Sequence, residues 1–411
     1  MILLTLAWRN LWRQARRTLI TSSTIAFGLG LALVSVGLGD GAHNQMVRGG
    51  IRLGEGHLTV QRRGYLEAPA NHVFLEDGTE VLRQVEAAGV PGRVAPRIFL
   101  QALISSANNA LPGGLLGIDV ADDPQVDALR PTLVEGAWLD VGDPRGLLIG
   151  RHMAERLKAK LGARIVVMAG VGGETESQLG RVRGIFSTGI DELDSFQVVA
   201  SLAFGRRMLP ARDGRQPLTR VAIFLEDDAQ TPVWREKLAA LPLPAEAQVL
   251  TWQEMLPQLV TFIAFDDAGN YIWLLFVLVM VTFGIINTIL MSVLERTREF
   301  GMLRALGMKP ARLLGLVLAE TLLLAGVSIV EGWIIGGAGH WYLATYGLDL
   351  TSLSPDVLKT AGVMMDPLMK SELSPQRVAM LTGIVFGTTM VSGLYPALRA
   401  SRVPPVRALQ T

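Results

Sequence analysis

Four apolar runs, with one long polar block between the first two, constrain this chain more than any other feature. The runs are Leu19–Leu38, Tyr271–Val293, Leu313–Ile335 and Val378–Tyr395. Apolar runs of about twenty residues with few charges are typical of membrane-spanning helices. The fourth run is the shortest and contains glycine. The pattern predicts four spans, with the polar block on one side of the membrane as a large soluble domain.

The composition agrees with a protein that is partly in the membrane. Hydrophobic residues make up 50% of the chain and charged residues 18%, which is too apolar for an ordinary soluble enzyme and too charged for a protein lying wholly in the bilayer. The net charge of +1 and the clustering of basic residues at span ends give no indication of nucleic-acid binding. Without cysteine, the chain has no disulfide and no thiolate metal site.

Basic residues set the expected orientation. Between the second and third runs lie Arg296, Arg298, Arg304, Lys309 and Arg312. By the positive-inside rule this turn faces the cytoplasm, and the basic residues near both chain ends place the termini there as well. Leu19–Leu38 is longer than the apolar core of a cleaved signal peptide, so we interpret it as a span. The sequence therefore predicts a multi-pass membrane protein; the resemblance described below implies the bacterial inner membrane.

These patterns divide the chain into membrane and soluble segments. They are a cytoplasmic amphipathic helix (1–18), a first span (19–39), a periplasmic α+β domain (40–270), a second span (271–293), a cytoplasmic turn with a short amphipathic helix (294–312), a third span (313–336), a periplasmic loop (337–377), a fourth span (378–396) and a cytoplasmic tail (397–411). Apolar residues of the loop that would suit an interfacial helix are Leu358, Met364, Met365, Leu368 and Met369.

The periplasmic block mixes strand and helix patterns. Strands are predicted at His57–Gln61, Arg97–Ile104, Leu115–Ile118, Leu147–Ile149, Ile165–Met168, Arg181–Phe186 and Arg220–Leu225. Helices are predicted at Leu75–Ala88, Arg151–Leu161, Ser201–Met208 and Thr231–Leu241, and Thr251–Phe265 is expected to run as a helix into the second span. Because strands follow both helices and other strands, α+β is the expected class.

Catalytic motifs are missing from the sequence. The five histidines are scattered with no metal-binding spacing, and no nucleophile elbow is present. A phosphate loop of the Gly-x-x-x-x-Gly-Lys-Ser/Thr type is also missing, so the chain is not expected to bind ATP by that route. We therefore expect no catalytic residues, no metal and no cofactor in this chain, and energy for any transport must come from a partner or an ion gradient.

Three polar residues interrupt the apolar runs: Asn287, Glu320 and Glu331. An ionised carboxylate at the bilayer centre costs on the order of 2.5–3.5 kcal/mol on a lenient scale, so both glutamates should face protein or water. They are about three helical turns apart and share one stripe. Either they relay protons or contact cargo, or Glu320 binds a neighbouring helix near Asn287 while Glu331 lies near the outer interface. The packing interpretation is favoured, and Asn287 is expected to bridge helices.

The segment from Asn287 to Met308 resembles a known signature. It reads Asn-Thr-Ile-Leu-Met-Ser-Val-Leu-Glu-Arg-Thr-Arg-Glu-Phe-Gly-Met-Leu-Arg-Ala-Leu-Gly-Met and is similar to the signature of FtsX-like ABC transporter permeases, the group that includes MacB and the lipoprotein-releasing LolC and LolE. Tyr395–Leu409 is similar to the closing segment of that family. Leu148–Leu157 and Arg183–Ser195 lean towards the LolC/LolE branch, whereas the short connection Ala169–Gln178 and the long loop Gly337–Arg377 differ from it.

The resemblance implies a coupling helix that seats in a cytoplasmic ABC ATPase dimer, with ATP and Mg bound in that partner. Carried over by position, the ATPase-coupling residues are Glu295, Arg296, Glu299, Gly301, Arg304, Ala305 and Gly307. The other implied partners are a second permease chain, identical or homologous, the lipid bilayer, and a lipoprotein or other periplasmic or membrane cargo. The function implied is extraction or release of lipoprotein-type cargo. The alternatives are MacB-like mechanotransmission efflux and an FtsX-like, non-transporting signal relay that controls a cell-wall hydrolase.

Overall fold

The computed structural model describes residues 2–13, 15–210, 215–349 and 368–402 and divides into two compact units. We call them the helical unit (1–44, 262–349 and 367–411) and the α+β unit (45–261). The helical unit contains most of the long apolar helices. The α+β unit contains most of the strands.

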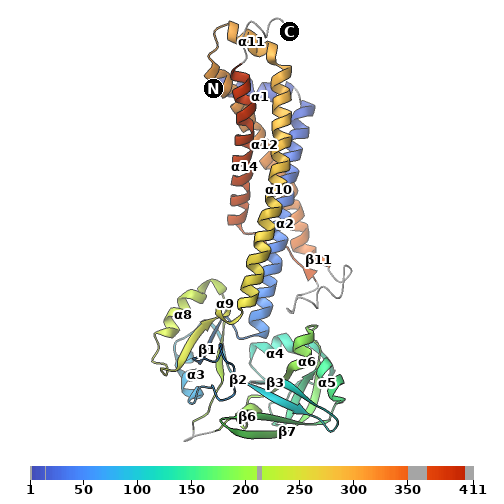
Figure 1. Cartoon of the computed structure of the whole chain (residues 1–411), viewed down its shortest axis with the longest axis vertical. Coiled ribbons are helices and arrows are strands. Elements are labelled where there is room, and N and C mark those ends of the chain that lie inside the picture. The colour runs from blue at the N-terminus through green and yellow to red at the C-terminus, as the bar shows by residue number, and fades with distance from the viewer. Residues whose placement is uncertain (1, 14, 211–214, 350–367, 403–411) are drawn as a thin grey trace. The chain divides into compact units, whose positions relative to one another are not determined.

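Long helices form the helical unit (Figure 1). Its elements are α1 (Ile2–Arg13), α2 (Ala15–Leu53) up to residue 44, α10 (Pro257–Glu295) from residue 262, α11 (Thr297–Ala305), α12 (Pro310–Tyr346), β11 (Leu348–Asp349), β12 (Leu368–Met369) and α14 (Pro375–Ser401). Within the described residues, four helices are long and apolar enough to cross a membrane, namely α2, α10, α12 and α14. Each contains one of the predicted apolar runs, and α2, α10 and α12 extend well beyond it.

Two glycines of α12 let this helix pack closely against α2. A Cβ atom at Gly332 would lie 2.9 Å from Leu29, and one at Gly336 would lie 2.7 Å from Leu33, both too close for a side chain. Small residues at such positions allow the backbones of membrane helices to approach each other. Leu29 and Leu33 are fully or almost fully buried in the core of the helical unit. The contact between α2 and α12 therefore depends on glycine at both positions.

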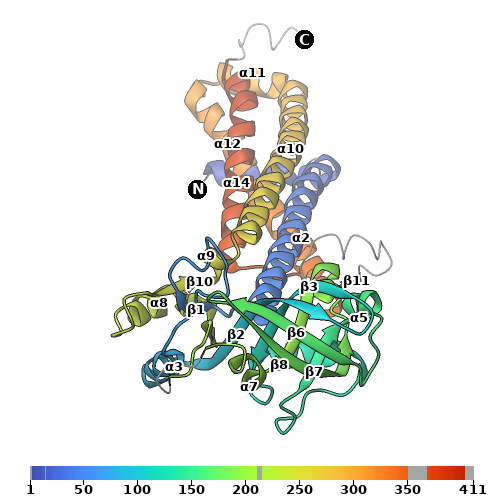
Figure 2. The same cartoon turned by 60° about the horizontal axis from the view of Figure 1, so that its bottom comes forward.

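The α+β unit is built on a large mixed sheet (Figure 2). Its strands are β1 (Leu58–Arg62), β2 (Gly92–Ser105), β3 (Ala110–Ile118), β4 (Leu133–Gly136), β5 (Gly146–Gly150), β6 (Arg164–Val171), β7 (Glu174–Phe186), β8 (Gln197–Ser201), β9 (Arg220–Leu225) and β10 (Ala247–Thr251). Its helices are α3 (Gly78–Ala87), α4 (Pro124–Leu129), α5 (Arg151–Leu157), α6 (Asp191–Phe196), α7 (Leu202–Arg206), α8 (Thr231–Ala239) and α9 (Trp252–Met255), with short 3₁₀ turns at Arg130–Thr132 and Asp228–Gln230.

The long strand β2 joins the two halves of this sheet. Its first part, Gly92–Arg97, pairs with β9, and its second part, Ile98–Ser105, pairs with β3. The strand order is β10-β1-β9-β2-β3-β8-β5-β7-β4, with β6 pairing to β2 and β7. Where the two parts meet, Arg97 forms a buried ion pair with Asp123 at 2.6 Å, and its guanidinium also donates to the carbonyl of Gly54. Because both charged groups are paired, their burial is tolerated.

Each predicted strand coincides with an observed one, but β4, β8 and β10 were not expected. The continuous helix expected over Thr251–Phe265 is wrong. Thr251 ends β10, α9 spans only Trp252–Met255, and α10 starts at Pro257. A residue before proline is driven out of the helical region, and Leu256 has φ −121° and ψ 59°. The proline therefore separates α9 from α10.

Other segments also differ in detail from the predicted patterns. The chain expected as one helix over 1–18 forms α1 up to Arg13, and α2 begins at Ala15. α12 continues to Tyr346, which lies in the segment expected as a loop over 337–377. Leu358, Met364 and Met365 lie outside the described residues. Leu368 and Met369 form β12, so they do not belong to a helix.

Candidate coupling site

A tight turn separates α11 from α12 and fixes where α11 ends. Gly307 has φ +93°, which a residue with a side chain rarely adopts. The Met308 N–H donates to the carbonyl of Leu303 at 3.0 Å, and the Gly307 N–H donates to that of Arg304 at 3.1 Å. These two bonds make a Schellman cap, which ends a helix at a left-handed glycine. Pro310 then starts α12 at a position where its missing N–H is not needed.

Arg296 lies at the centre of an ion-pair cluster at the corner between α10 and α11. Its side chain is only 9% exposed, and one terminal nitrogen donates to both carboxylate oxygens of Glu320 on α12, at 3.0 and 3.1 Å. The Arg296 Nε–H donates to Glu299 of α11 at 3.1 Å. The guanidinium carbon also lies 5.0 Å from the centre of the Phe300 ring, in cation–π range. The buried Arg296–Glu320 ion pair thus links the corner between α10 and α11 to α12.

The N-terminal segment completes this cluster from the other side. Arg13 of α1 donates to both oxygens of Glu299 at 2.6 and 2.9 Å, and Arg17 of α2 donates to both oxygens of Glu295 at 2.6 and 2.8 Å. The Asn10 amide donates to Glu320 at 2.7 Å. Exposed ion pairs are worth roughly 0–1 kcal/mol, so these outer contacts mainly fix geometry. We call Asn10, Arg13, Arg17, Glu295, Arg296, Glu299 and Glu320 the elbow cluster.

Glu299 remains ionised near neutral pH. Partial burial disfavours its charged form, but the hydrogen bonds and positive charges of Arg296 and Arg13 outweigh this effect and hold the pKa of Glu299 below its ordinary value. Phe300, the next residue, is 1% exposed and packs among side chains of α1, α12 and α14. One side of α11 is therefore held by charge pairs and an aromatic anchor.

The other side of α11 is open. Leu306 is 85% exposed and Met302 46% exposed, and Ala305 and Gly307 are also exposed. No Cβ atom placed at Gly307 would meet another atom within 4 Å. The exposed Leu306 offers an apolar contact to a partner, and Gly307 next to it leaves its backbone uncovered by any side chain of the described residues. This face, defined as Met302, Ala305, Leu306 and Gly307, is called the open face below.

The predicted coupling residues thus fall into two groups. Glu295, Arg296 and Glu299 take part in the elbow cluster, and Gly301 is a buried residue of α11. Ala305 and Gly307 lie on the open face. Arg304 is half-buried, and its Nη1 has no hydrogen-bond partner among the residues that the structure describes.

The polar residues of the spans do not meet one another. Glu320 belongs to the elbow cluster, where its partners are Asn10 and Arg296. The expected hydrogen bond to the region near Asn287 is not observed among the residues that the structure describes. The Asn287 side chain is exposed and makes no hydrogen bond within the described part of the chain, so the expected bridge between helices is not formed inside this subunit. Glu331 is half-buried, and one of its oxygens has no hydrogen-bond partner among the described residues.

Sequence reasoning missed Asn10, Arg13 and Arg17 as members of the cluster. Arg13 and Arg17 were visible only as basic residues of an amphipathic segment. Their partners are more than 270 positions away along the chain, with separations of 286 and 278 residues. No local pattern reveals such a pairing. The one usable signal was that arginines near the N-terminus and glutamates of the turn after the second span were both expected at the same membrane face.

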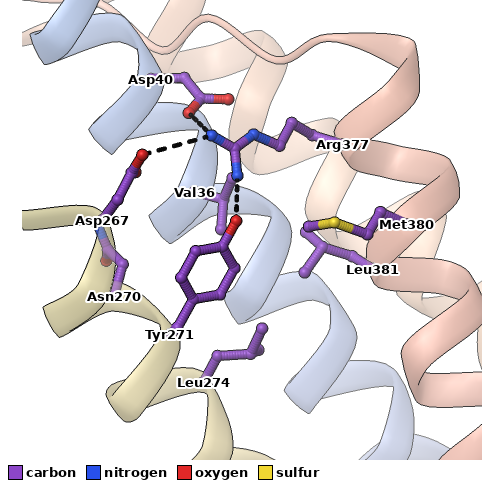
Figure 3. Close-up of a pocket in the computed structure, with 9 residues that line it drawn as sticks. All are labelled: Val36, Asp40, Asp267, Asn270, Tyr271, Leu274, Arg377, Met380 and Leu381. Atoms are coloured by element: carbon purple, nitrogen blue, oxygen red, sulfur yellow. Dashed lines mark hydrogen bonds and ion pairs between the residues drawn. The ribbon is translucent and has the colours of Figure 1, made fainter. Parts of the chain in front are cut away.

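A second charged cluster lies at the other end of the spans (Figure 3). Arg377, at the start of α14, lies 3.4 Å from Asp40 of α2 and 3.9 Å from Asp267 of α10, and donates to the Tyr271 hydroxyl at 2.9 Å. These residues border a small cavity of about 20 Å³, enough for about one water molecule. The cluster ties the start of α14 to α2 and α10.

Three members of this region have the donor atoms of a metal site. One ligand atom each from Asp40, His43 and Asp267 lie within 4.8 Å of one another. The Arg377 guanidinium already supplies a positive charge to both carboxylates, and His43 Nε2 lies 2.9 Å from Asp266. The carboxylates and His43 therefore already have charged partners within the protein, and the cluster links the helices that carry them.

Comparison with known proteins identifies the family. Residues 271–405 match the model of the FtsX-like permease C-terminal family, and residues 18–241, more than half of the chain, match the MacB-like periplasmic core domain. The chain belongs to the FtsX/MacB-type ABC transporter permeases. This permease has four spans and a MacB-like periplasmic α+β domain between the first two. No ATPase domain is detected in it, and the family implies an ATPase partner.

Relatives of this permease extend over nearly its whole length. It is 22% identical to the lipoprotein-releasing system transmembrane protein LolC of Neisseria meningitidis, over 96% of this chain and 94% of that one. It is 23% identical to an uncharacterized ABC transporter permease of Methanocaldococcus jannaschii, over 99% and 97%. The crystal structure of the periplasmic region of MacB from Actinobacillus actinomycetemcomitans is similar with a TM-score of 0.35 and 13% identity, covering 52% of this chain and 95% of that one.

Proposed function

We propose that this permease couples ATP hydrolysis by a separate ATPase dimer to periplasmic movements that extract or release lipoprotein-type cargo from the bacterial inner membrane. In this proposal α11 is the coupling helix. The basic residues between α10 and α12 support a cytoplasmic α11 by the positive-inside rule, with both termini on the same side. Residues 1–18 and 397–411 then belong to the cytoplasmic part, and 40–270 and 337–377 to the periplasmic part.

The elbow cluster is the observation that carries this proposal. Arg296 joins the corner of α10 and α11 to Glu320 of α12, while Arg13 and Arg17 join it to α1 and α2. A partner that moves α11 therefore displaces several helices together and not one loop alone. The open face supplies an unoccupied apolar contact at the same place. Glu295, Arg296, Glu299 and Gly301 would hold the coupling helix, while Ala305, Gly307 and the adjoining Arg304 would lie near the ATPase.

A second permease chain is also part of the proposal. Phe276, Met280 and Phe283 of α10 are exposed and follow helical spacing, and Asn287 continues the same stripe. Lipid would leave the Asn287 amide without a hydrogen-bond partner, which is unfavourable in a bilayer. We therefore place the stripe against a second, identical or homologous, permease chain. Glu331 remains a candidate for a polar contact of α12.

The cargo assignment has a physical basis and a comparison behind it. Each buried methylene of an acyl chain contributes about 0.8 kcal/mol to membrane binding, and two or more chains anchor a protein stably. Release of such a protein needs external work, which an ATPase supplies. The relative named as a lipoprotein-releasing protein supports this cargo. The match to a MacB-like periplasmic core domain favours MacB-like efflux as the first alternative function. The second alternative is an FtsX-like signal relay, which does not transport cargo.

Cargo retention tests this proposal. The permease is purified from its own membranes together with the ATP-binding subunit that accompanies it, placed in nanodiscs, and analysed by mass spectrometry. We expect an acylated protein in the nucleotide-free complex, released by ATP but not by a non-hydrolysable analogue. A complex that instead retains a periplasmic adaptor and no acylated protein would support efflux and contradict lipoprotein release.

A further inference from the structure

The outer side of α1 carries an exposed apolar stripe. Leu4, Trp8 and Trp12 follow one another at intervals of four residues, so they lie on one side of the helix. Their side chains are 49%, 47% and 43% exposed, and the two indole rings form an edge-to-face pair with centres 5.9 Å apart. Ala7 and Leu11, by contrast, are buried in the helical unit. We call Leu4, Trp8 and Trp12 the tryptophan stripe.

The elbow cluster uses only two of the four arginines near the N-terminus. Arg13 and Arg17 pair with glutamates of that cluster. Arg9 and Arg16 are exposed and form no ion pair among the residues that the structure describes. Arg9 lies three residues before Trp12 on α1, a spacing that makes two side chains neighbours on a helix surface. Positive charge beside the tryptophan stripe is therefore left without a counter-charge in the described part of the chain.

The connection to α2 holds α1 at a membrane surface. The apolar run of α2 begins at Leu19, and a helix rises about 1.5 Å per residue, so Arg16 lies about 4.5 Å beyond the apolar part of this span. α1 ends at Arg13, two residues before α2 begins, and Arg13 binds Glu299 of α11 (Figure 1). Tryptophan is enriched at the level of the lipid headgroups, because its ring is apolar and its N–H is polar. Both features place the tryptophan stripe at the membrane face that carries the elbow cluster.

We propose that Arg9 and Arg16, together with the tryptophan stripe, bind anionic phospholipids of the leaflet next to the elbow cluster. Such a lipid suits both features at once, because its phosphate accepts hydrogen bonds from guanidinium groups and its acyl chains cover the exposed rings. A zwitterionic headgroup fits less well, since it adds a cation that the arginines repel. Each basic residue at an anionic membrane surface strengthens binding about fivefold. The inference rests on the four-span fold and is independent of the ATPase and cargo assignments.

Two matched lipids test this inference on the full-length permease in a non-ionic detergent, with bound lipid counted by native mass spectrometry. Palmitoyl-oleoyl phosphatidylglycerol and the phosphatidylcholine with the same acyl chains differ only in the headgroup. We expect the first phosphatidylglycerol to bind at least about tenfold more tightly than the first phosphatidylcholine, because two arginines contribute. Equal affinities for the two lipids would overturn the inference.

Arg9→Gln combined with Arg16→Gln should reduce this preference to about threefold or less. Arg298→Gln combined with Arg312→Gln is the matched control, because it removes two exposed arginines of α11 and α12 at the same membrane face. The control should keep the wild-type preference. All four side chains are exposed, so both double variants should unfold at the wild-type temperature. An equal loss of preference in the two double variants would show diffuse attraction to this face and contradict a site on α1.

Two further measurements separate lipid from other occupants of this surface. Glycerol 3-phosphate carries a phosphate without acyl chains, and in large excess it should not displace phosphatidylglycerol. Displacement would mean that the anion alone is recognised, which contradicts a lipid site. The titration is then repeated on the permease in complex with its ATP-binding subunit, where the preference for phosphatidylglycerol should persist. Its loss in the complex would show that protein and not lipid covers the tryptophan stripe, and would overturn the inference.

Discussion

Replacing Arg296 by methionine is expected to lower the free energy of unfolding of the permease by about 3 kcal/mol, because it removes the cation that pairs with Glu320. Removing one partner of a buried ion pair typically costs about 3–5 kcal/mol. The Glu320 side chain is 17% exposed and keeps the Asn10 amide, which favours the lower end of that range. Chemical unfolding in detergent, followed by tryptophan fluorescence, measures the change.

The chain offers a matched control for this variant. Arg298→Met removes the same charge two residues further along, at an exposed position of α11, and should change stability by less than about 0.5 kcal/mol. In the double variant Arg296→Met with Glu320→Gln, no carboxylate is left unpaired, so much of the lost stability should return. Equal stability of Arg296→Met and Arg298→Met, or a double variant no more stable than Arg296→Met, would show that the elbow cluster does not hold the corner.

Leu306→Glu is expected to reduce association with the ATP-binding subunit at least tenfold while leaving the permease folded. Leu306 is 85% exposed, so the change removes little internal packing. A buried apolar contact with a partner would be replaced by a carboxylate that must lose its water. Leu161→Glu, at a leucine that is 45% exposed in the periplasmic domain, is the matched control and should retain wild-type association. Co-purification and stimulated ATP hydrolysis provide the two readouts.

Leu306 is a sharper probe than the charged residues of α11. Glu299 is held by Arg13 and Arg296, so reversing its charge would place three cations together and disturb the permease itself. A loss of association in that variant would have two explanations. Leu306 has no such internal role. Unaltered ATPase association of the Leu306→Glu variant would therefore directly contradict docking on the open face.

The spans and the class of the periplasmic domain could be predicted because they depend on local patterns. Runs such as Tyr271–Val293 are long and apolar enough to define α10 without knowledge of its neighbours. Strands such as Arg220–Leu225 are equally plain, since every residue after Arg220 is apolar. Boundaries were harder. Pro257 separates α9 from α10, an effect that competes with the helical pattern of Thr251–Phe265.

The candidate coupling site could be predicted only in part. The turn between α10 and α12 was recognisable from its sequence, but the division of its residues into internal and open groups was not. That division depends on Arg13, Arg17 and Glu320, which come from distant segments and meet only in the folded helical unit.

Cross-linking from the open face tests most directly whether α11 is the docking point of the ATPase. A photoreactive phenylalanine analogue replaces Leu306, or Leu161 as the comparison, and intact membranes are illuminated before the products are identified by mass spectrometry. The account predicts a covalent adduct between position 306 and the ATP-binding subunit, and none from position 161. An adduct of position 306 with a periplasmic protein, or the absence of any adduct with the ATP-binding subunit, would contradict it.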